Sequence, residues 1–397
     1  MLNNFANNND ILLITNAIKK YQGDIRLVGG CVRDNILKRQ TVDIDFATTL
    51  LPYQIIEALN IAHIKSIPTG IKHGTITAIV NNTAYEITTL RSDIYCDGRH
   101  AEVKFTNNWQ QDASRRDFTF NALYCDEKGT VYDYFSGIQD LKNKQLNFIG
   151  DPETRIQEDY LRILRAFRFH AAICSQNKLS DIIIQSCTKY ASCISKLSRE
   201  RIRDEFFKLL SCINLVNTLK IMQKCNVLQK IIPFEVLPNV ISSTVISHTE
   251  PIVKLAALLR TNKNEFSIDK IRDSLYLSNS DKKLLLSLVN NNLELPLSIM
   301  DQQKYINKLG KKIYCYLIKI RHAELTLNNH DLVQYIEYAD KFVIPEFPLS
   351  GKDFLAIGYQ EGRHLGDVLK KLRNLWEDSA YQLTRHQLLE HGKKLLD

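Results

Sequence analysis

Residues 27–46 read LVGGCVRDNILKRQTVDIDF, and this stretch decides how the first part of the chain is expected to fold. A short apolar run ends in Gly29 and Gly30, and adjacent glycines let backbone N–H groups approach an anion closely. Arg33 follows on a segment whose positive helix N-terminus would face the same anion, and its planar guanidinium suits a triphosphate. The glycine pair alone favours a simpler interpretation, a tight turn followed by a surface arginine.

Two aspartates, Asp43 and Asp45, lie ten and twelve positions after Arg33. Side chains two residues apart in a strand point to the same face, so both carboxylates are predicted to project together over Ile44 and Phe46. Paired carboxylates repel unless a cation bridges them, and hard oxygen ligands suit Mg²⁺. We therefore predict Asp43 and Asp45 as catalytic metal ligands and Mg²⁺ as the cofactor. Two solvated surface aspartates are the alternative, which the glycine turn and the arginine make less favourable.

Composition sets broad limits on the protein. Its 397 residues are 44% hydrophobic and 24% charged, which suits a soluble globular protein of two to four domains. The net charge of +8 fits a nucleic-acid partner, although it fits a generically basic protein equally well. The nine cysteines include no CxxC pair, and neither a secretory leader nor a membrane-spanning apolar run is visible. We expect a cytoplasmic protein.

The pattern of the chain changes near residue 150. Before it, β-like runs alternate with turns, including a hairpin of residues 74–80 and 84–90 around Asn81-Asn82. After it, apolar residues recur with helical period at 156–172, 199–210, 281–289 and 368–375. The predicted fold class is α+β: a head with a mixed β-sheet and helices, followed by an elongated all-α region.

Several motifs together resemble one family. They are GGCVRDNIL and TVDIDFATT at 29–37 and 41–49, PTGIKHGT at 68–75, RRDFTFNAL at 115–123, EDYLRILR at 158–165 and SRERIRDE at 198–205. They resemble the class II tRNA nucleotidyltransferases and the bacterial poly(A) polymerases, which share a fold. The resemblance implies a seahorse-like arrangement: a catalytic head (1–150), a neck with the base-reading helix (151–210), a body (211–295) and an RNA-binding tail (296–397).

The resemblance also implies a reaction, the sequential addition of C, C and A to the 3′ end of tRNA from CTP and ATP, with pyrophosphate released. The expected partners are the 3′ end and acceptor arm of tRNA, and no protein partner or membrane is predicted. Three alternatives stay open: a poly(A) polymerase, a partial enzyme that adds only CC or only A, and a non-catalytic RNA-binding module. Residues 97–101 fall in a loop that the family uses in switching from C to A.

Two groups of residues extend the predicted nucleotide site. Arg116 is expected to hold phosphate or ribose oxygens and Asp117 to accept a hydrogen bond from a ribose hydroxyl, with a surface ion pair between them as the alternative. The second group is Asp159, Arg162, Arg165 and Arg168, which recur every three residues on one predicted helix. The complete nucleotide-binding set is Gly30, Arg33, Arg116, Asp117, Asp159, Arg162, Arg165 and Arg168.

Base choice is expected to depend on an acceptor and a donor side by side. Asp159 would accept from cytosine N4 or adenine N6, and Arg162 would donate to cytosine N3 or adenine N1. Guanine and uracil present the opposite pattern and would be rejected. A solvated charged stripe is the alternative, and it is nearly as favourable for Arg168, which drifts to the flank of the helix. Glu86 is interpreted as an ordinary strand residue, with a further carboxylate near the metals as the alternative.

Overall fold

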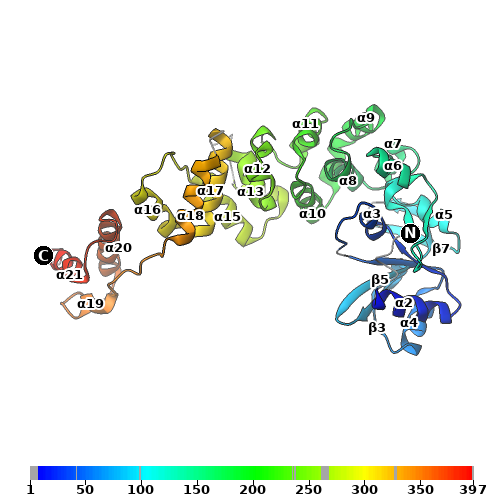
Figure 1. Ribbon diagram of the computed structural model, residues 1–397, viewed down its shortest axis with the longest axis horizontal. Coiled ribbons are helices and arrows are strands. Elements are labelled where there is room, and N and C mark those ends of the chain that lie inside the picture. Colours follow the sequence, from blue (N-terminus) through cyan, green and yellow to red (C-terminus); the bar gives the residue numbers. More distant parts are fainter. Residues whose placement is uncertain are drawn as a thin grey trace. The chain divides into compact units, whose positions relative to one another are not determined.

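The computed structural model describes residues 8–41, 43–97, 100–234, 236, 238–260, 268–325 and 329–395 (Figure 1). The chain divides into two compact units, Met1–Pro233 with Asp269–Tyr276, and Phe234–Ile268 with Leu277–Asp397. The predicted boundaries at 150, 210 and 295 stay predictions. Each described helix is too short or too polar to span a lipid bilayer.

The first unit begins with a mixed seven-stranded sheet in the order β3-β4-β5-β2-β1-β8-β9. Strands β2 and β5 pair in parallel, and the other neighbours in this sheet are antiparallel. A separate two-stranded sheet is formed by β6 and β7. The strands are β1 Ile25–Val28, β2 Asp45–Thr48, β3 Lys65–Gly70, β4 Thr75–Val80, β5 Thr83–Thr89, β6 Arg91–Asp97, β7 His100–Phe105, β8 Leu123–Cys125 and β9 Val131–Asp133.

The predicted hairpin at residues 74–90 is confirmed. Strands β4 and β5 pair in antiparallel register from Thr75↔Thr88 to Val80↔Thr83. Asn81 and Asn82 join them with φ angles of 48° and 62°, the left-handed conformation that a tight two-residue turn needs. This hairpin supplies two of the seven strands, and β5 continues the sheet by pairing with β2.

Short helices connect and cover the sheet. Helices α2 and α4 lie side by side (Figure 1). Apolar residues of both are buried, among them Ile14, Ile18, Ile55 and Leu59. The helices and 3-10 turns of this part are α2 Asn9–Lys20, α3 Gly30–Ile36, α4 Pro52–Ile61, η1 Ile71–His73, α5 Trp109–Ser114, η2 Thr119–Asn121 and α6 Gly137–Asn143.

The rest of the first unit is helical. Its elements are α7 Pro152–Glu158, α8 Leu161–Phe169, the π-helical turn η3 His170–Cys174, α9 Asp181–Lys189, η4 Ala191–Lys196, α10 Arg199–Leu210, α11 Val216–Lys224, η5 Leu228–Lys230 and α14 Ile268–Leu275. The predicted helix at 199–210 is confirmed.

The prediction of one continuous helix from Ile156 to Ala172 is wrong. The first helix, α7, ends at Glu158, and Asp159 is extended with φ −154° and ψ 107°. Its side chain accepts a hydrogen bond from the backbone N–H of Leu161, two residues on, at 3.1 Å, as aspartate does in turns. Asp159 therefore precedes the helix that carries Arg162, Arg165 and Arg168 instead of lying on it.

All the regular elements among the described residues of the second unit are helices. Its elements are η6 Pro238–Ser242, α12 Thr244–Ser247, α13 Pro251–Leu259, α15 Asn279–Asn290, α16 Ile299–Leu309, α17 Lys311–Leu325, α18 Asn329–Lys341, α19 Gly351–Leu355, α20 Arg363–Asp378 and α21 Arg385–Lys393. Helices α19, α20 and α21 enclose a core of their own, which includes Phe354, Leu372, Trp376 and Leu388. The predicted helical segments at 281–289 and 368–375 lie within α15 and α20.

Candidate active site

The glycine turn joins β1 to α3. Gly29 has φ 76° and ψ −123°, in the region that favours glycine, and its N–H donates to the carbonyl of Leu123 at 3.0 Å. Gly30 opens α3, and a Cβ at Gly30 would lie 3.7 Å from the guanidinium of Arg33. The turn therefore brings the end of β1, the start of α3 and the guanidinium of Arg33 together, as the sequence predicts.

A cavity of about 560 Å³ opens beside this turn. Every residue that the sequence singled out for the site lines it: Gly30, Arg33, Asp43, Asp45, Arg116, Asp117, Asp159, Arg162, Arg165 and Arg168. Further lining residues, which the sequence did not single out, include Arg115, Asn121, Phe169 and Lys208. The structure thus gathers motifs separated by more than a hundred residues around one space.

Asp43 and Asp45 form the acidic edge of this cavity. Strand β2 begins at Asp45, so the predicted extended run starts two residues late and Asp43 lies before the strand. Both aspartates nevertheless line the same cavity, while Phe46 is buried beneath them. Among the described residues, neither carboxylate has a hydrogen-bond or ion-pair partner.

The electrostatic surroundings of Asp45 are unfavourable for its charge. Burial, followed by the carboxylates of Glu86 and Asp43, raises the pKa of Asp45 to about 6, and the nearby Arg116 opposes this shift. Glu86 is the exposed residue of β5 that pairs in register with Asp45. An unshielded carboxylate pair of this kind fits a hard divalent cation.

The protein provides few ligands for such a cation. The described residues contain no group of three or more His, Cys, Asp or Glu side chains placed to hold a metal ion. Two carboxylates would therefore share the ion with substrate phosphates and water, which is how Mg²⁺ is usually bound. The donor set fits a metal that arrives with a nucleotide.

The cavity also has a positively charged side, which we call the arginine wall and define as Arg33, Arg116, Arg165 and Arg168. Arg33 donates from Nε and Nη2 to Asp34 at 2.9 and 2.8 Å. Its Nη1 donates to Oδ1 of Asn121 at 2.6 Å, and its guanidinium lies over the ring of Phe169 at 4.9 Å. The side chain is therefore fixed on three sides.

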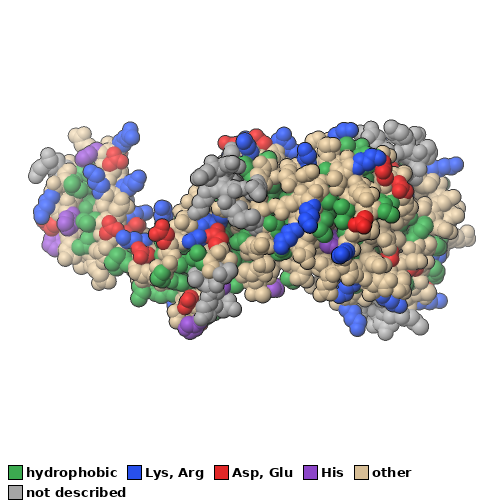
Figure 2. All heavy atoms as spheres, turned by 90° about the horizontal axis from the view of Figure 1, so that it is seen from above, with side chains coloured by type: hydrophobic (Ala, Val, Ile, Leu, Met, Phe, Trp, Pro, Cys, Tyr) green, Lys and Arg blue, Asp and Glu red, His purple; other side chains and the backbone are tan. Residues whose placement is uncertain are grey.

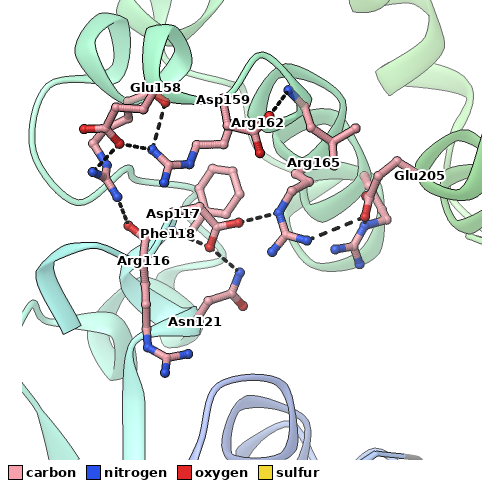
Figure 3. Close-up of polar contacts among 12 residues, drawn as sticks. Arg116, Asp117, Phe118, Asn121, Glu158, Asp159, Arg162, Arg165 and Glu205 are labelled. Carbon is pink, nitrogen blue, oxygen red and sulfur yellow. Dashed lines mark hydrogen bonds and ion pairs between the residues drawn. The ribbon is translucent and has the colours of Figure 1, made fainter. Parts of the chain in front are cut away.

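Asp117 connects Asn121 of the head to Arg165 of α8 (Figure 3). Its Oδ1 accepts from the N–H of Phe118 at 2.8 Å and from Nδ2 of Asn121 at 2.9 Å, and its Oδ2 accepts from Nε of Arg165 at 2.6 Å. Burial alone would raise the pKa of Asp117, but the charge of Arg165 and these hydrogen bonds lower it to about 2. The alternative of an Arg116–Asp117 surface ion pair is wrong, because Arg116 pairs with Asp112 instead.

Glu205 of α10 pairs with Arg165 and Arg168 and fixes their positions. Its Oε2 accepts from Nε of Arg168 at 2.6 Å, and its Oε1 lies 3.5 Å from Nη1 of Arg165. Glu205 is buried, and Arg168 also stacks over Phe169 at 3.9 Å. Arg168 therefore lines the cavity, contrary to the alternative of a solvated stripe, while the opposite face of α8 buries Ile163, Leu164 and Phe167.

The proposed base-reading pair is also held by neighbours (Figure 3). Oδ2 of Asp159 accepts from Nη2 of Arg201 at 2.7 Å. Arg162 pairs with Glu158, and its Nη1 donates to the carbonyl of Arg155 at 2.8 Å. The acceptor Asp159 and the donor Arg162 lie three positions apart in the chain and are oriented by different partners.

Sequence reasoning missed several polar residues of this network, among them Asp112, Asn121 and Glu205. Asp112 precedes Arg115 and Arg116 by three and four positions, a helical spacing that signals ion pairs. Asn121 carries no such signal. Glu205 meets residues about forty positions away, so only the folded chain reveals it. Of the predicted switching loop, Gly98 and Arg99 lie outside the described residues, between β6 and β7.

Comparison with known proteins agrees with this architecture. The model of the poly(A) polymerase head domain matches residues 25–147, and that of the probable RNA- and SrmB-binding site of polymerase A matches residues 179–235. The structure of the Bacillus stearothermophilus CCA-adding enzyme in complex with CTP superposes with a TM-score of 0.79 at 21% identity, covering 97% of this chain and 98% of that one. The Thermotoga maritima CCA-adding enzyme complexed with tRNA gives 0.63 at 19% identity, covering 98% and 96%. The predicted fold class is confirmed.

Fold and cavity together fit a nucleotidyltransferase, a class of enzyme that generally uses a divalent metal. Sequence relatives make the family specific. Human mitochondrial CCA tRNA nucleotidyltransferase 1 is 34% identical over 96% of this chain and 89% of its own length, and the Danio rerio protein of that name is 33% identical over 94% and 87%. The chain belongs to the CCA tRNA nucleotidyltransferase family, as its motifs predicted.

Proposed function

We propose that this chain adds C, C and A to the 3′ end of tRNA, using CTP and ATP and releasing pyrophosphate. The observation that carries the proposal is the single cavity that joins the acidic edge, the arginine wall and the start of α8. Relatives named for this reaction, aligned over nearly the whole chain, support it. Similar structures in complex with CTP and with tRNA support the choice of partners.

The acidic edge would hold Mg²⁺ through Asp43 and Asp45. When bound there, Mg²⁺ would neutralise charge on the phosphates and assist loss of the proton from the primer 3′ hydroxyl. Arg33 and Arg116 would bind triphosphate oxygens.

Base choice would depend on Asp159 and Arg162. A carboxylate accepts more than one hydrogen bond per oxygen, so Asp159 retains capacity for the amino group of cytosine or adenine while Arg201 holds it. Arg162 has a fork of donors, some of which are directed to Glu158 and to backbone carbonyls. Asp117 would receive the ribose 2′ hydroxyl, and Arg165 and Arg168 would complete the positive side of the pocket.

The RNA itself would be held by charge. Figure 2 shows Lys and Arg side chains spread over the drawn face of both units, with acidic side chains between them. Contacts of Lys and Arg side chains with phosphates recognise the backbone and shape of the acceptor arm more than its sequence.

The domain division at 150, 210 and 295 and a cytoplasmic location remain part of this proposal. The human and Danio rerio relatives are named as mitochondrial, so fractionation of the native protein tests the location.

One assay tests the reaction. The protein is incubated with Mg²⁺, CTP and ATP and with tRNAs that lack CCA, CA or A, and the products are sequenced. Completion of all three ends in CCA is the expected result, with Asp43→Ala as the inactive control. Long A tails on unrelated RNA would show a poly(A) polymerase, and products that stop at CC or gain only A would show a partial enzyme.

A further inference from the structure

Asp112 is a buried carboxylate that lies behind the cavity and does not line it. It belongs to α5 and is 1% exposed. Its Oδ1 accepts from Nε and Nη2 of Arg115 at 2.9 and 2.8 Å. Its Oδ2 accepts from Nη2 of Arg116 at 3.1 Å and from the hydroxyl of Tyr124 at 2.7 Å. One side chain thus gathers two arginines and a tyrosine.

These contacts decide where the guanidinium of Arg116 lies. Its Nη2 is tied to Asp112, and the ring of Tyr124 lies 5.5 Å from its central carbon. Its Nη1 is directed to the glycine turn, 3.5 Å from the point where a Cβ on Gly29 would be. An arginine that lost this anchor would have several rotamers to choose from, and holding one of them on binding costs conformational entropy.

We propose that Asp112 is a positioning residue that fixes Arg116 at the glycine turn for nucleotide binding, an inference that rests on the proposed function. The carboxylate meets the requirements of such an anchor. Burial would raise its pKa, but the charges of Arg116 and Arg115 hold the pKa of Asp112 well below its usual range, so it stays ionised at neutral pH. It also accepts the backbone N–H of Arg91 at 3.2 Å, where β6 begins.

The test compares two buried aspartates of the same unit. Asp140 is 8% exposed and accepts from Oγ1 of Thr119 at 2.5 Å and Nδ2 of Asn147 at 2.9 Å, and it does not line the cavity. Asp112→Asn and Asp140→Asn each remove one buried charge without changing side-chain size. We expect Asp112→Asn to raise the KM for CTP and ATP about tenfold with the KM for tRNA unchanged, and Asp140→Asn to leave all three unchanged. Thermal unfolding of both variants identifies any general loss of folding.

A double-mutant cycle with Arg116→Ala separates positioning from a general structural role. If Asp112 acts through Arg116, adding Asp112→Asn to Arg116→Ala produces no further rise in KM for the nucleotide. Effects that multiply, or equal changes in Asp112→Asn and Asp140→Asn, would overturn the inference. If Asp112→Asn does not fold, Tyr124→Phe replaces it in the cycle, because it removes only the hydroxyl donor to Oδ2. A rise of about threefold in KM, absent from the Arg116→Ala background, is then expected.

The cycle also distinguishes failure of the inference from failure of the proposed site. If Arg116→Ala raises the nucleotide KM and Asp112→Asn does not, only the positioning role is wrong. If Arg116→Ala leaves nucleotide kinetics unchanged, the proposed role of Arg116 is wrong, and the inference fails with it. CCA addition by the unaltered protein is measured in the same experiment and remains independent of either result.

Discussion

The two charged sides of the cavity differ in how the protein supports them. At the acidic edge, Asp43 and Asp45 have no hydrogen-bond or ion-pair partner among the described residues. In the arginine wall, each guanidinium is paired with a carboxylate of the protein: Arg33 with Asp34, Arg116 with Asp112, Arg165 with Asp117 and Glu205, and Arg168 with Glu205. The arginines that would form the positive side of the pocket are held in advance, whereas the carboxylates that would bind the cation are not.

This difference has a physical reason. Arginine has a long side chain, and ordering it only when the nucleotide binds would weaken binding by the entropy lost, so a fixed wall is favourable. A carboxylate that was already neutralised by arginine would bind a cation weakly. The arginine wall should therefore add to the stability of the fold, and the acidic edge should subtract from it.

The largest expected effect comes from Asp45→Asn at the acidic edge. Loss of a metal ligand should reduce nucleotide incorporation roughly a thousandfold, because the ion supplies several kcal/mol of transition-state stabilisation. The same variant should be more stable than the natural protein in EDTA at pH 7.5, on the order of 1 kcal/mol, since the raised pKa of Asp45 shows that its ionised form is disfavoured in the fold.

Incorporation assays and urea unfolding measure these two effects separately. Added Mg²⁺ should stabilise the natural protein and have little effect on the variant. A variant that lost stability in EDTA, or that kept its activity, would contradict the assignment of the acidic edge.

The corresponding experiment on the arginine wall is Glu205→Gln, which tests whether the wall adds to stability. It leaves Arg165 and Arg168 without their shared buried charge, so unfolding free energy should fall by about 3 kcal/mol. The nucleotide KM should rise as well, because the two arginines lose their fixed positions. Glu390→Gln, which changes an exposed partner of Lys393 in α21, is the control and should leave both quantities unchanged. A stable Glu205→Gln variant would mean that the wall is not held as described.

The sequence could reveal the residues that would contact the nucleotide and the metal, but not the residues that hold them in place. Asp43, Asp45 and Arg33 belong to a compact motif whose chemistry follows from residue type and spacing. Glu205 and Asn121 act through contacts made by folding, and no local period indicates them. The helical period failed at Asp159, where the backbone is extended and the side chain bonds to the N–H of Leu161. Apolar spacing does not reveal such a local hydrogen bond.

A smaller effect is expected at the base-reading position. Arg162→Ala removes the proposed donor to cytosine N3 and adenine N1, so discrimination against UTP and GTP should fall roughly thirtyfold, with a smaller change in tRNA affinity. Arg203→Ala is the matched control, because Arg203 pairs with Asp204 and does not line the cavity. Misincorporation is measured by sequencing products from single-nucleotide reactions. Weaker RNA binding with unchanged base choice would contradict the base-reading role.

The smallest expected effect is a pH dependence of stability that arises at Asp117, the carboxylate paired with Arg165. The pKa of Asp117 is lowered from 3.8 to about 2 in the fold, so its ion pair with Arg165 contributes stability that is fully present above the unfolded pKa. That contribution is lost as pH falls through the folded value. The difference in unfolding free energy between the natural protein and Asp117→Asn should therefore shrink by about 1–2 kcal/mol between pH 5 and pH 2. Urea titrations of both proteins across this range measure it, and a difference that did not change with pH would contradict the lowered pKa of Asp117.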